Sequence, residues 1–69
     1  MRDKILDALE AIYTANKKEA EVELEVYLNS TVGVGEHPHV VTECDKLLRR
    51  IDDAESYILK VKALRKFSV

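Results

Sequence analysis

The sequence contains few of the residues with which small proteins are cross-linked. Its 69 residues include a single cysteine, Cys44, so no disulfide can form within the chain. No cluster of cysteine and histidine has the spacing of a zinc finger. Chains below about 70–80 residues rarely build a core with a comfortable stability margin, and oligomerisation is the remaining common source of stability. We therefore expect a homo-oligomer, with a dimer favoured.

Long apolar runs and a strong excess of one charge are also missing. No apolar run approaches the roughly 18 residues that a membrane span needs, and no charged-then-apolar leader begins the chain. We expect a soluble cytoplasmic protein with a reduced Cys44 and no membrane partner. The 11 basic and 13 acidic residues nearly balance, which argues against a general nucleic-acid binder. An acidic block is nevertheless formed by Glu19, Glu21, Glu23 and Glu25. A basic end is formed by Lys60, Lys62, Arg65 and Lys66.

Glycine and proline are confined to one short segment. Gly33, Gly35 and Pro38 are the only such residues, and the flanking segments are rich in the helix formers Ala, Leu, Glu and Lys. This arrangement predicts an all-α protein of one domain, an antiparallel two-helix hairpin over residues 1–69. We expect a first helix at about 2–29, a turn at 30–37 and a second helix at about 38–66. Two such hairpins would complete a four-helix bundle as a dimer.

The ends of the two helices also have candidate residues. Asn29 or Gly33 is suited to end the first helix in a left-handed conformation. Pro38 is suited to the first turn of the second helix, where its missing N–H costs no hydrogen bond.

The strongest pattern in the sequence lies in the second helical segment. Seven apolar residues follow one another at intervals of four and three residues, the heptad rhythm of a coiled-coil seam. They are Val40, Cys44, Leu47, Ile51, Ala54, Ile58 and Val61. We expect these residues to form the core seam of the second helix, with Cys44 acting as a small hydrophobic residue. Val41, Leu48 and Leu59 widen the stripe, as a helix of a bundle requires.

The first helical segment carries a less regular pattern. At about 100° per residue its main apolar stripe consists of Leu6, Leu9, Tyr13, Ala20 and Tyr27. Ile5, Ile12 and Leu24 lie beside this stripe. Residues 19–26 alternate between polar and apolar types, which is typical of a strand. We favour a helix there, because no turn signal interrupts the stripe and four glutamates suit a helix better than a strand.

A second apolar stripe lies about 120° around the first helix. Its members are the small residues Ala8, Ala11, Ala15, Val22 and Val26. A helix in an isolated hairpin needs one apolar face, so two faces indicate two neighbours. Small side chains let a second helix approach closely. We therefore predict that this stripe is the oligomer interface.

Asn16 and Glu23 interrupt the main stripe of the first helix. A polar residue that is buried in a seam must be paired, and it often sets the register or the oligomeric state. A polar residue at the edge of the seam reaches solvent. The sequence leaves both interpretations open, and it offers Lys46 or Arg49 as a partner for Glu23 across the hairpin.

Glu36, His37 and His39 are weak candidates for a metal site. Two histidines beside a carboxylate offer ligands that divalent transition metals accept. A stable site needs further ligands, and the spacing of Cys44 places its side chain in the core. An exposed polar turn explains the same residues, so we expect neither a bound metal nor another cofactor, and no catalytic residue.

Two alternative functions follow from the charged residues. The basic end would contact phosphates weakly in a nucleic-acid-associated accessory protein, although basic residues also suit the C-terminus of a helix. The second alternative is a metal-dependent or nucleotide-cleaving enzyme. All-α nucleotide pyrophosphohydrolases hold magnesium with pairs of acids, and Asp7 with Glu10 and Asp52 with Glu55 have a similar spacing. These pairs flank core positions, so solvated helix faces explain them better.

The segment between the helices also carries a resemblance. Residues 26–38 read Val-Tyr-Leu-Asn-Ser-Thr-Val-Gly-Val-Gly-Glu-His-Pro. This stretch resembles small helical-hairpin proteins of marine tailed phages, in which Val-Gly-Ile-Gly-Glu-His-Pro joins two helices. Thr31 and His39 stand where that family has Pro and Asp. The resemblance implies a viral or virus-derived helical hairpin in the host cytoplasm and carries no known activity.

These patterns together predict a small helical protein that is not an enzyme. We expect an oligomeric interaction or structural module, built on a coiled-coil seam, that can also dock on a larger protein. Nucleic acid is not an expected partner.

Overall fold

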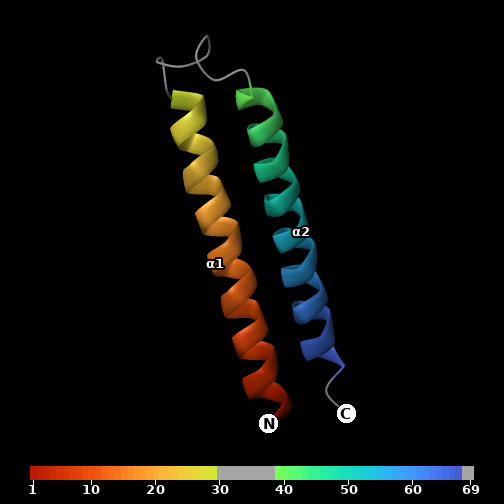
Figure 1. Ribbon diagram of the computed structural model, residues 1–69. Helices are drawn as coiled ribbons and strands as arrows, with labels where there is room; N and C mark the ends of the chain where they lie inside the picture. The colour runs from red at the N-terminus through yellow and green to blue at the C-terminus, as the bar shows by residue number, and fades with distance from the viewer. Residues whose placement is uncertain (30–38, 68–69) are drawn as a thin grey trace.

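The computed structural model describes residues 1–29 and 39–67 of the chain. Helix α1 spans Arg2–Asn29 and helix α2 spans Val40–Lys66. The helices lie side by side and antiparallel, so the two chain ends meet at one end of a rod (Figure 1) with Cα extents of 55 × 14 × 13 Å. The prediction of an all-α two-helix hairpin is confirmed. Residues 19–26 are helical despite their alternating pattern.

One of the four helix ends differs slightly from the expected one. Helix α2 begins at Val40, with His39 as its N-cap, two residues after the expected start. Its acidic first turn and basic last turn both complement the helix dipole. At the end of α1, the side-chain amide of Asn29 donates to the carbonyl oxygen of Glu25 at 2.9 Å. The expectations for Gly33 and Pro38 lie outside the described residues.

The core is a thin seam between the two helices. Its buried residues are Leu6, Ala20, Leu47, Ala54 and Val61. The other four members of the α2 seam, Val40, Cys44, Ile51 and Ile58, are half-buried. Among the described residues α1 is the one element that packs against α2, so this face of α2 packs on α1. Halfway along the rod, the rings of Tyr13 and Tyr57 stack with centroids 5.0 Å apart.

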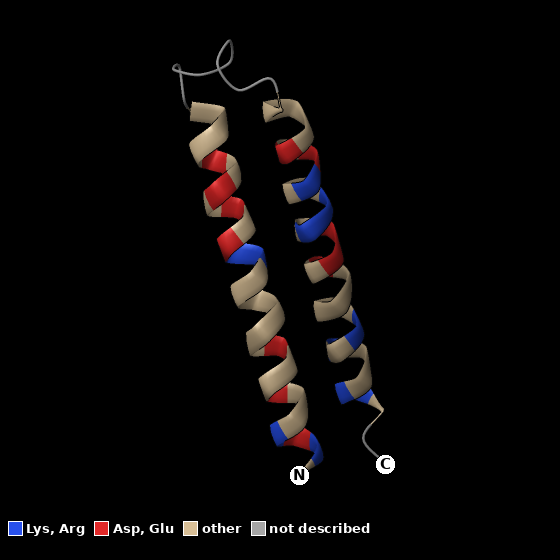
Figure 2. Ribbon diagram, in the orientation of Figure 1, with Lys and Arg blue, Asp and Glu red and all other residues tan. Residues whose placement is uncertain are grey.

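Ion pairs between the helices line both edges of the seam, where opposite charges face each other along the rod (Figure 2). On one edge, Lys17 pairs with Glu55 at 3.1 Å. On the other, Arg50 bridges Glu19 at 3.3 Å and Glu23 at 3.0 Å. These contacts hold α1 and α2 in one antiparallel register.

Glu23 therefore has a different partner from the two that the sequence offered. Arg49 binds Asp45 and Lys46 binds Glu43, both within α2. Arg50 lies three residues after Leu47 and four before Ala54, so its side chain flanks the seam and faces α1. Asn16 and Glu23 are both exposed, so in the single chain they occupy the edge of the seam.

The chain ends are tied together by arginines. Arg2, at the start of α1, donates hydrogen bonds to the carbonyl oxygens of Leu64 and Phe67 at the end of α2. The last carbonyl groups of a helix lack partners within it, and that of Leu64 accepts from the backbone N–H of Phe67 as well as from Arg2. Arg2 therefore adds a second cap to the end of α2 from the neighbouring helix. Nearby, Arg65 reaches back to Asp7 at 2.8 Å and Glu10 at 3.4 Å.

Candidate functional site

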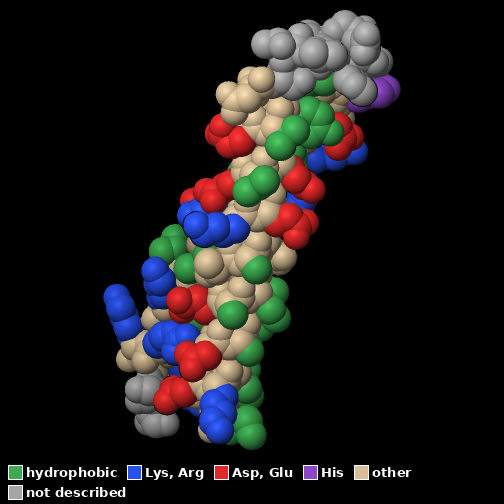
Figure 3. Space-filling view, turned by 90° about the vertical axis from the view of Figure 1, so that its left-hand side faces the viewer, with side chains coloured by type: hydrophobic (Ala, Val, Ile, Leu, Met, Phe, Trp, Pro, Cys, Tyr) green, Lys and Arg blue, Asp and Glu red, His purple; other side chains and the backbone are tan. Residues whose placement is uncertain are grey.

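The side of α1 that faces away from α2 carries a row of uncovered apolar side chains. We call it the outer α1 face and define it by Ile5, Ala8, Ala11, Ile12, Ala15, Val22 and Val26. All seven are exposed, including all five that the sequence predicts as the oligomer interface. Figure 3 looks on this side of the molecule and shows hydrophobic side chains spread along its whole length.

Ile5 and Ile12 belong to this face although the sequence placed them beside the inner stripe. Their side chains are 52% and 53% exposed, whereas Leu6 is 5% exposed. Their spacing in the sequence relative to Ala8 and Ala15 identifies them as members of the outer α1 face. Ile5, Ala8, Ile12 and Ala15 are spaced 3-4-3, which is itself a heptad pattern.

Glu19 is the polar interruption of this row. It occupies the position between Ala15 and Val22, and its carboxylate is drawn toward Arg50 of α2 at 3.3 Å. The cross-helix pair thus turns the charge of Glu19 toward the edge of the outer α1 face.

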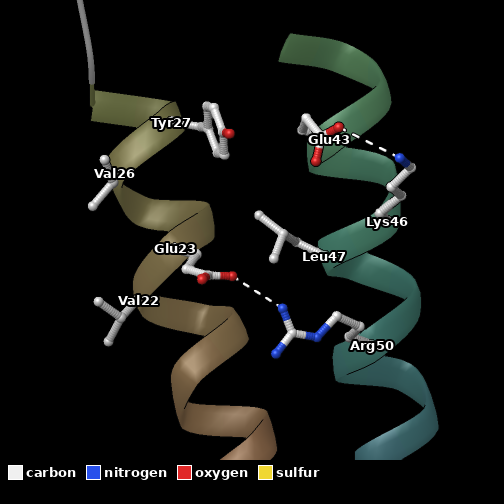
Figure 4. Close-up of a pocket in the computed structure, with 8 residues that line it drawn as sticks. All are labelled: Val22, Glu23, Val26, Tyr27, Glu43, Lys46, Leu47 and Arg50. Carbon is white, nitrogen blue, oxygen red and sulfur yellow. Dashed lines mark hydrogen bonds and ion pairs between the residues drawn. The ribbon is translucent and has the colours of Figure 1, made fainter. Parts of the chain in front are cut away.

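An open groove of about 470 Å³ lies between the helices at the end remote from the termini. Its lining residues are Val22, Glu23, Val26, Tyr27, Glu43, Lys46, Leu47 and Arg50. Tyr27 and Leu47 point toward each other across it, while Val22 and Val26 point away from α2 (Figure 4). The Glu23–Arg50 and Glu43–Lys46 pairs satisfy its charges. The lining of the groove thus combines apolar side chains with charged side chains that are already paired.

Three of the four spaced acids pair with residues of the other helix. Asp7 and Glu10 both bind Arg65, and Glu55 binds Lys17. Within residues 1–29 and 39–67, no three His, Cys, Asp or Glu side chains come close enough to hold a metal ion.

The other candidate residues for chemistry are scattered. Glu36 and His37 lie outside the described residues, and His39 is exposed at the start of α2. Cys44 is a half-buried free thiol in the seam of α2. These positions give Cys44 the surroundings of a packing residue.

The basic end of the chain is partly neutralised by α1. The pKa of Arg65 is raised above its ordinary value, mainly by the hydrogen bond to Asp7. The negative charges of Asp7 and Glu10 also raise this pKa, and desolvation opposes them. Arg65 is cationic at neutral pH, as arginine side chains are in proteins, and its charge is paired with these two carboxylates. Lys60 lies over the ring of Tyr57, with its ammonium 5.5 Å from the ring centroid. Lys62 and Lys66 are exposed.

Comparisons with protein-family models, curated proteins and solved structures find no match. Neither helix within the described residues combines the length and the apolar character that a membrane crossing requires. The motif that resembles the phage hairpin proteins lies at residues 33–38, outside the described part of the chain. The functional assignment therefore depends on the surface of the hairpin itself.

Proposed function

We propose that this chain is a non-enzymatic interaction module that self-associates through the outer α1 face. The main support for the proposal is that every member of this apolar row along α1 is exposed. In a single hairpin these side chains face water, and a second helix would remove them from it. Transfer of apolar surface from water contributes about 25 cal/mol per Å².

The size of the core supports the proposal. Among the described residues only five are buried, and two of these are alanines. Thirteen large hydrophobic side chains remain exposed in the same part of the chain. A 69-residue chain with so small a core has little stability of its own. Packing against a second copy would add apolar burial without a disulfide or a metal.

The composition of the face also favours a helical partner. Ala8, Ala11 and Ala15 present almost no side-chain bulk, so a second helix can approach closely in this half of α1. Several charged groups of α1, among them Lys17, Glu19 and Asp7, are already paired with α2. These groups would add no unpaired charge to an interface with a partner helix.

The proposal is tested by placing a charge at the centre of the outer α1 face. In Ala15→Glu, association would bury an unpaired carboxylate, which proteins strongly disfavour. We expect the dimer dissociation constant, measured by sedimentation equilibrium, to rise roughly tenfold or more. Far-UV circular dichroism should show unchanged helix content at saturating concentration, because Glu is a good helix former.

The matched control is Leu59→Glu, which adds the same charge at an exposed apolar position of α2, where Leu59 is 67% exposed. This variant should associate as the unmodified chain does. If Ala15→Glu and Leu59→Glu change the dissociation constant equally, the outer α1 face is not the interface.

A further inference from the structure

The outer α1 face carries a seam with its own heptad spacing. Ile5, Ala8, Ile12, Ala15, Glu19, Val22 and Val26 follow one another at intervals of three and four residues, and all are exposed. This is the spacing of a helix that packs along its length against one parallel or antiparallel neighbour. Because α2 covers a different side of α1, the neighbour must come from another chain.

Two charged residues flank this seam at its opposite ends. Lys4 precedes Ile5 and Glu25 precedes Val26, so they occupy equivalent positions in their heptads. Neither has an oppositely charged partner within residues 1–29 and 39–67. They are about 32 Å apart along one helix at 1.5 Å per residue. They therefore cannot pair within a single copy.

An antiparallel second copy brings these two charges together. In antiparallel coiled coils, equivalent flanking positions of the two helices face each other across the seam. When Ile5 packs opposite Val22 of the second copy, Lys4 lies beside its Glu25. The twofold symmetry repeats the same pair at the other end of the interface.

The same register also matches the sizes of the seam residues. Ile12 lies opposite Ala15 of the second copy, so a large side chain meets a small one. Glu19 lies opposite Ala8, which leaves room for its carboxylate to keep its bond to Arg50. Alternation of large and small residues is how helix layers interdigitate.

The competing arrangements bring like charges together. A parallel pair would set Glu19 opposite Glu19 and align the two acidic blocks, although Lys18 would then face Glu23, which Arg50 already binds. An antiparallel pair shifted by one heptad, with Ile12 opposite Val22, would set Lys18 opposite Lys18. Like charges at facing positions disfavour an alignment and so help to select the correct one.

We infer that two copies pair through α1 in antiparallel orientation, with Lys4 of each copy beside Glu25 of the other. The inference rests on the proposed self-association and adds its orientation and register. The partner surface is thus a second copy of this chain.

The test is a charge swap in the full chain, read by sedimentation equilibrium at low salt. Lys4→Glu and Glu25→Lys each replace two attractive contacts by two repulsive ones, so each should weaken the dimer about tenfold. The double variant restores both pairs and should return within about threefold of the original dissociation constant. Both swaps complement the dipole of α1, but Glu25→Lys also removes the hydrogen bond that Asn29 donates to the Glu25 carboxylate. Far-UV circular dichroism of each variant therefore separates loss of the dimer from loss of helix.

Lys18→Glu is the matched control. In the inferred register Lys18 faces Ala11, so this variant should change the dissociation constant by no more than about twofold. In a parallel pair Lys18 would face Glu23, and the same change would weaken the dimer. In about 1 M salt, where the Debye length is about 3 Å, the effects of the two swaps should shrink.

The outcomes separate the two proposals. If the unmodified chain dimerises but the double swap stays as weak as the single swaps, the orientation is wrong and self-association stands. If Lys18→Glu weakens the dimer and Lys4→Glu does not, the parallel arrangement replaces the inferred one, because Lys4 would there face Leu9. A folded chain that is monomeric at every concentration overturns both proposals.

Discussion

Adjacent residues of this hairpin make different contacts, because successive side chains of a helix point to different sides of it. Arg49 and Arg50 are neighbours in sequence, yet Arg49 binds Asp45 of its own helix and Arg50 binds Glu19 and Glu23 of the other. The side chain of Arg50 is 43% exposed and that of Arg49 is 76% exposed. Only Arg50 therefore contributes to holding the two helices together.

Replacing Arg50 with methionine removes both cross-helix pairs and keeps the length of the side chain. Exposed pairs contribute about 0.2–1 kcal/mol each, so Arg50→Met should lower the free energy of unfolding by about 0.5–1.5 kcal/mol at low salt. Arg49→Met removes one i,i+4 pair and should cost less than about 0.5 kcal/mol. Urea unfolding at one fixed protein concentration measures the unfolding free energy of both variants. Equal decreases would show that the ion pairs of Arg50 do not stabilise the packing of α1 on α2.

Pairing of individual residues was the part of the fold that sequence predicted least well. Lys46 and Arg49 were wrong as partners of Glu23, because the pattern of one helix does not tell which flank faces the neighbour. The same reason explains why Ile5 and Ile12 were placed beside the inner stripe. A broad apolar arc on α1 contains both faces, and only the position of α2 divides it.

The two helices differ in how completely their sequences define their packing. The seam of α2 is a regular heptad, and all seven of its members are buried or half-buried. The hairpin and the helical state of residues 19–26 were also predictable, because glycine and proline occur only between the helices. Helix α1 instead has apolar residues on two of its sides, and the outer side has no partner among residues 1–29 and 39–67.

The period of the α2 seam is tested by two adjacent leucines. Leu47 is 5% exposed and Leu48 is 55% exposed. Leu47→Ala removes buried side-chain volume and should cost about 2–4 kcal/mol of unfolding free energy. Leu48→Ala should cost less than about 1 kcal/mol.

Thermal unfolding followed by circular dichroism, at equal concentrations, compares the two leucine variants. Both substitutions introduce the same residue into the same helix, so differences in helix propensity cancel. A larger loss for Leu48→Ala would mean that α2 packs on α1 through a different side.

The whole molecule is a rod whose interior is one layer of side chains thick. Five buried residues and a row of cross-helix ion pairs hold α1 against α2. Such a rod has a high ratio of surface to volume, and domains of this size bury a small share of their surface. Association through the outer α1 face would lower the ratio of surface to volume, because that face extends along most of α1.

The most direct test of self-association is the mass of the unmodified chain in solution as a function of concentration. Because association is governed by mass action, the thermal midpoint should rise together with the mass. Sedimentation equilibrium should give an average mass that rises from 7.9 kDa toward twice that value. A mass of 7.9 kDa at every concentration, with full helix content and a constant thermal midpoint, would contradict the account.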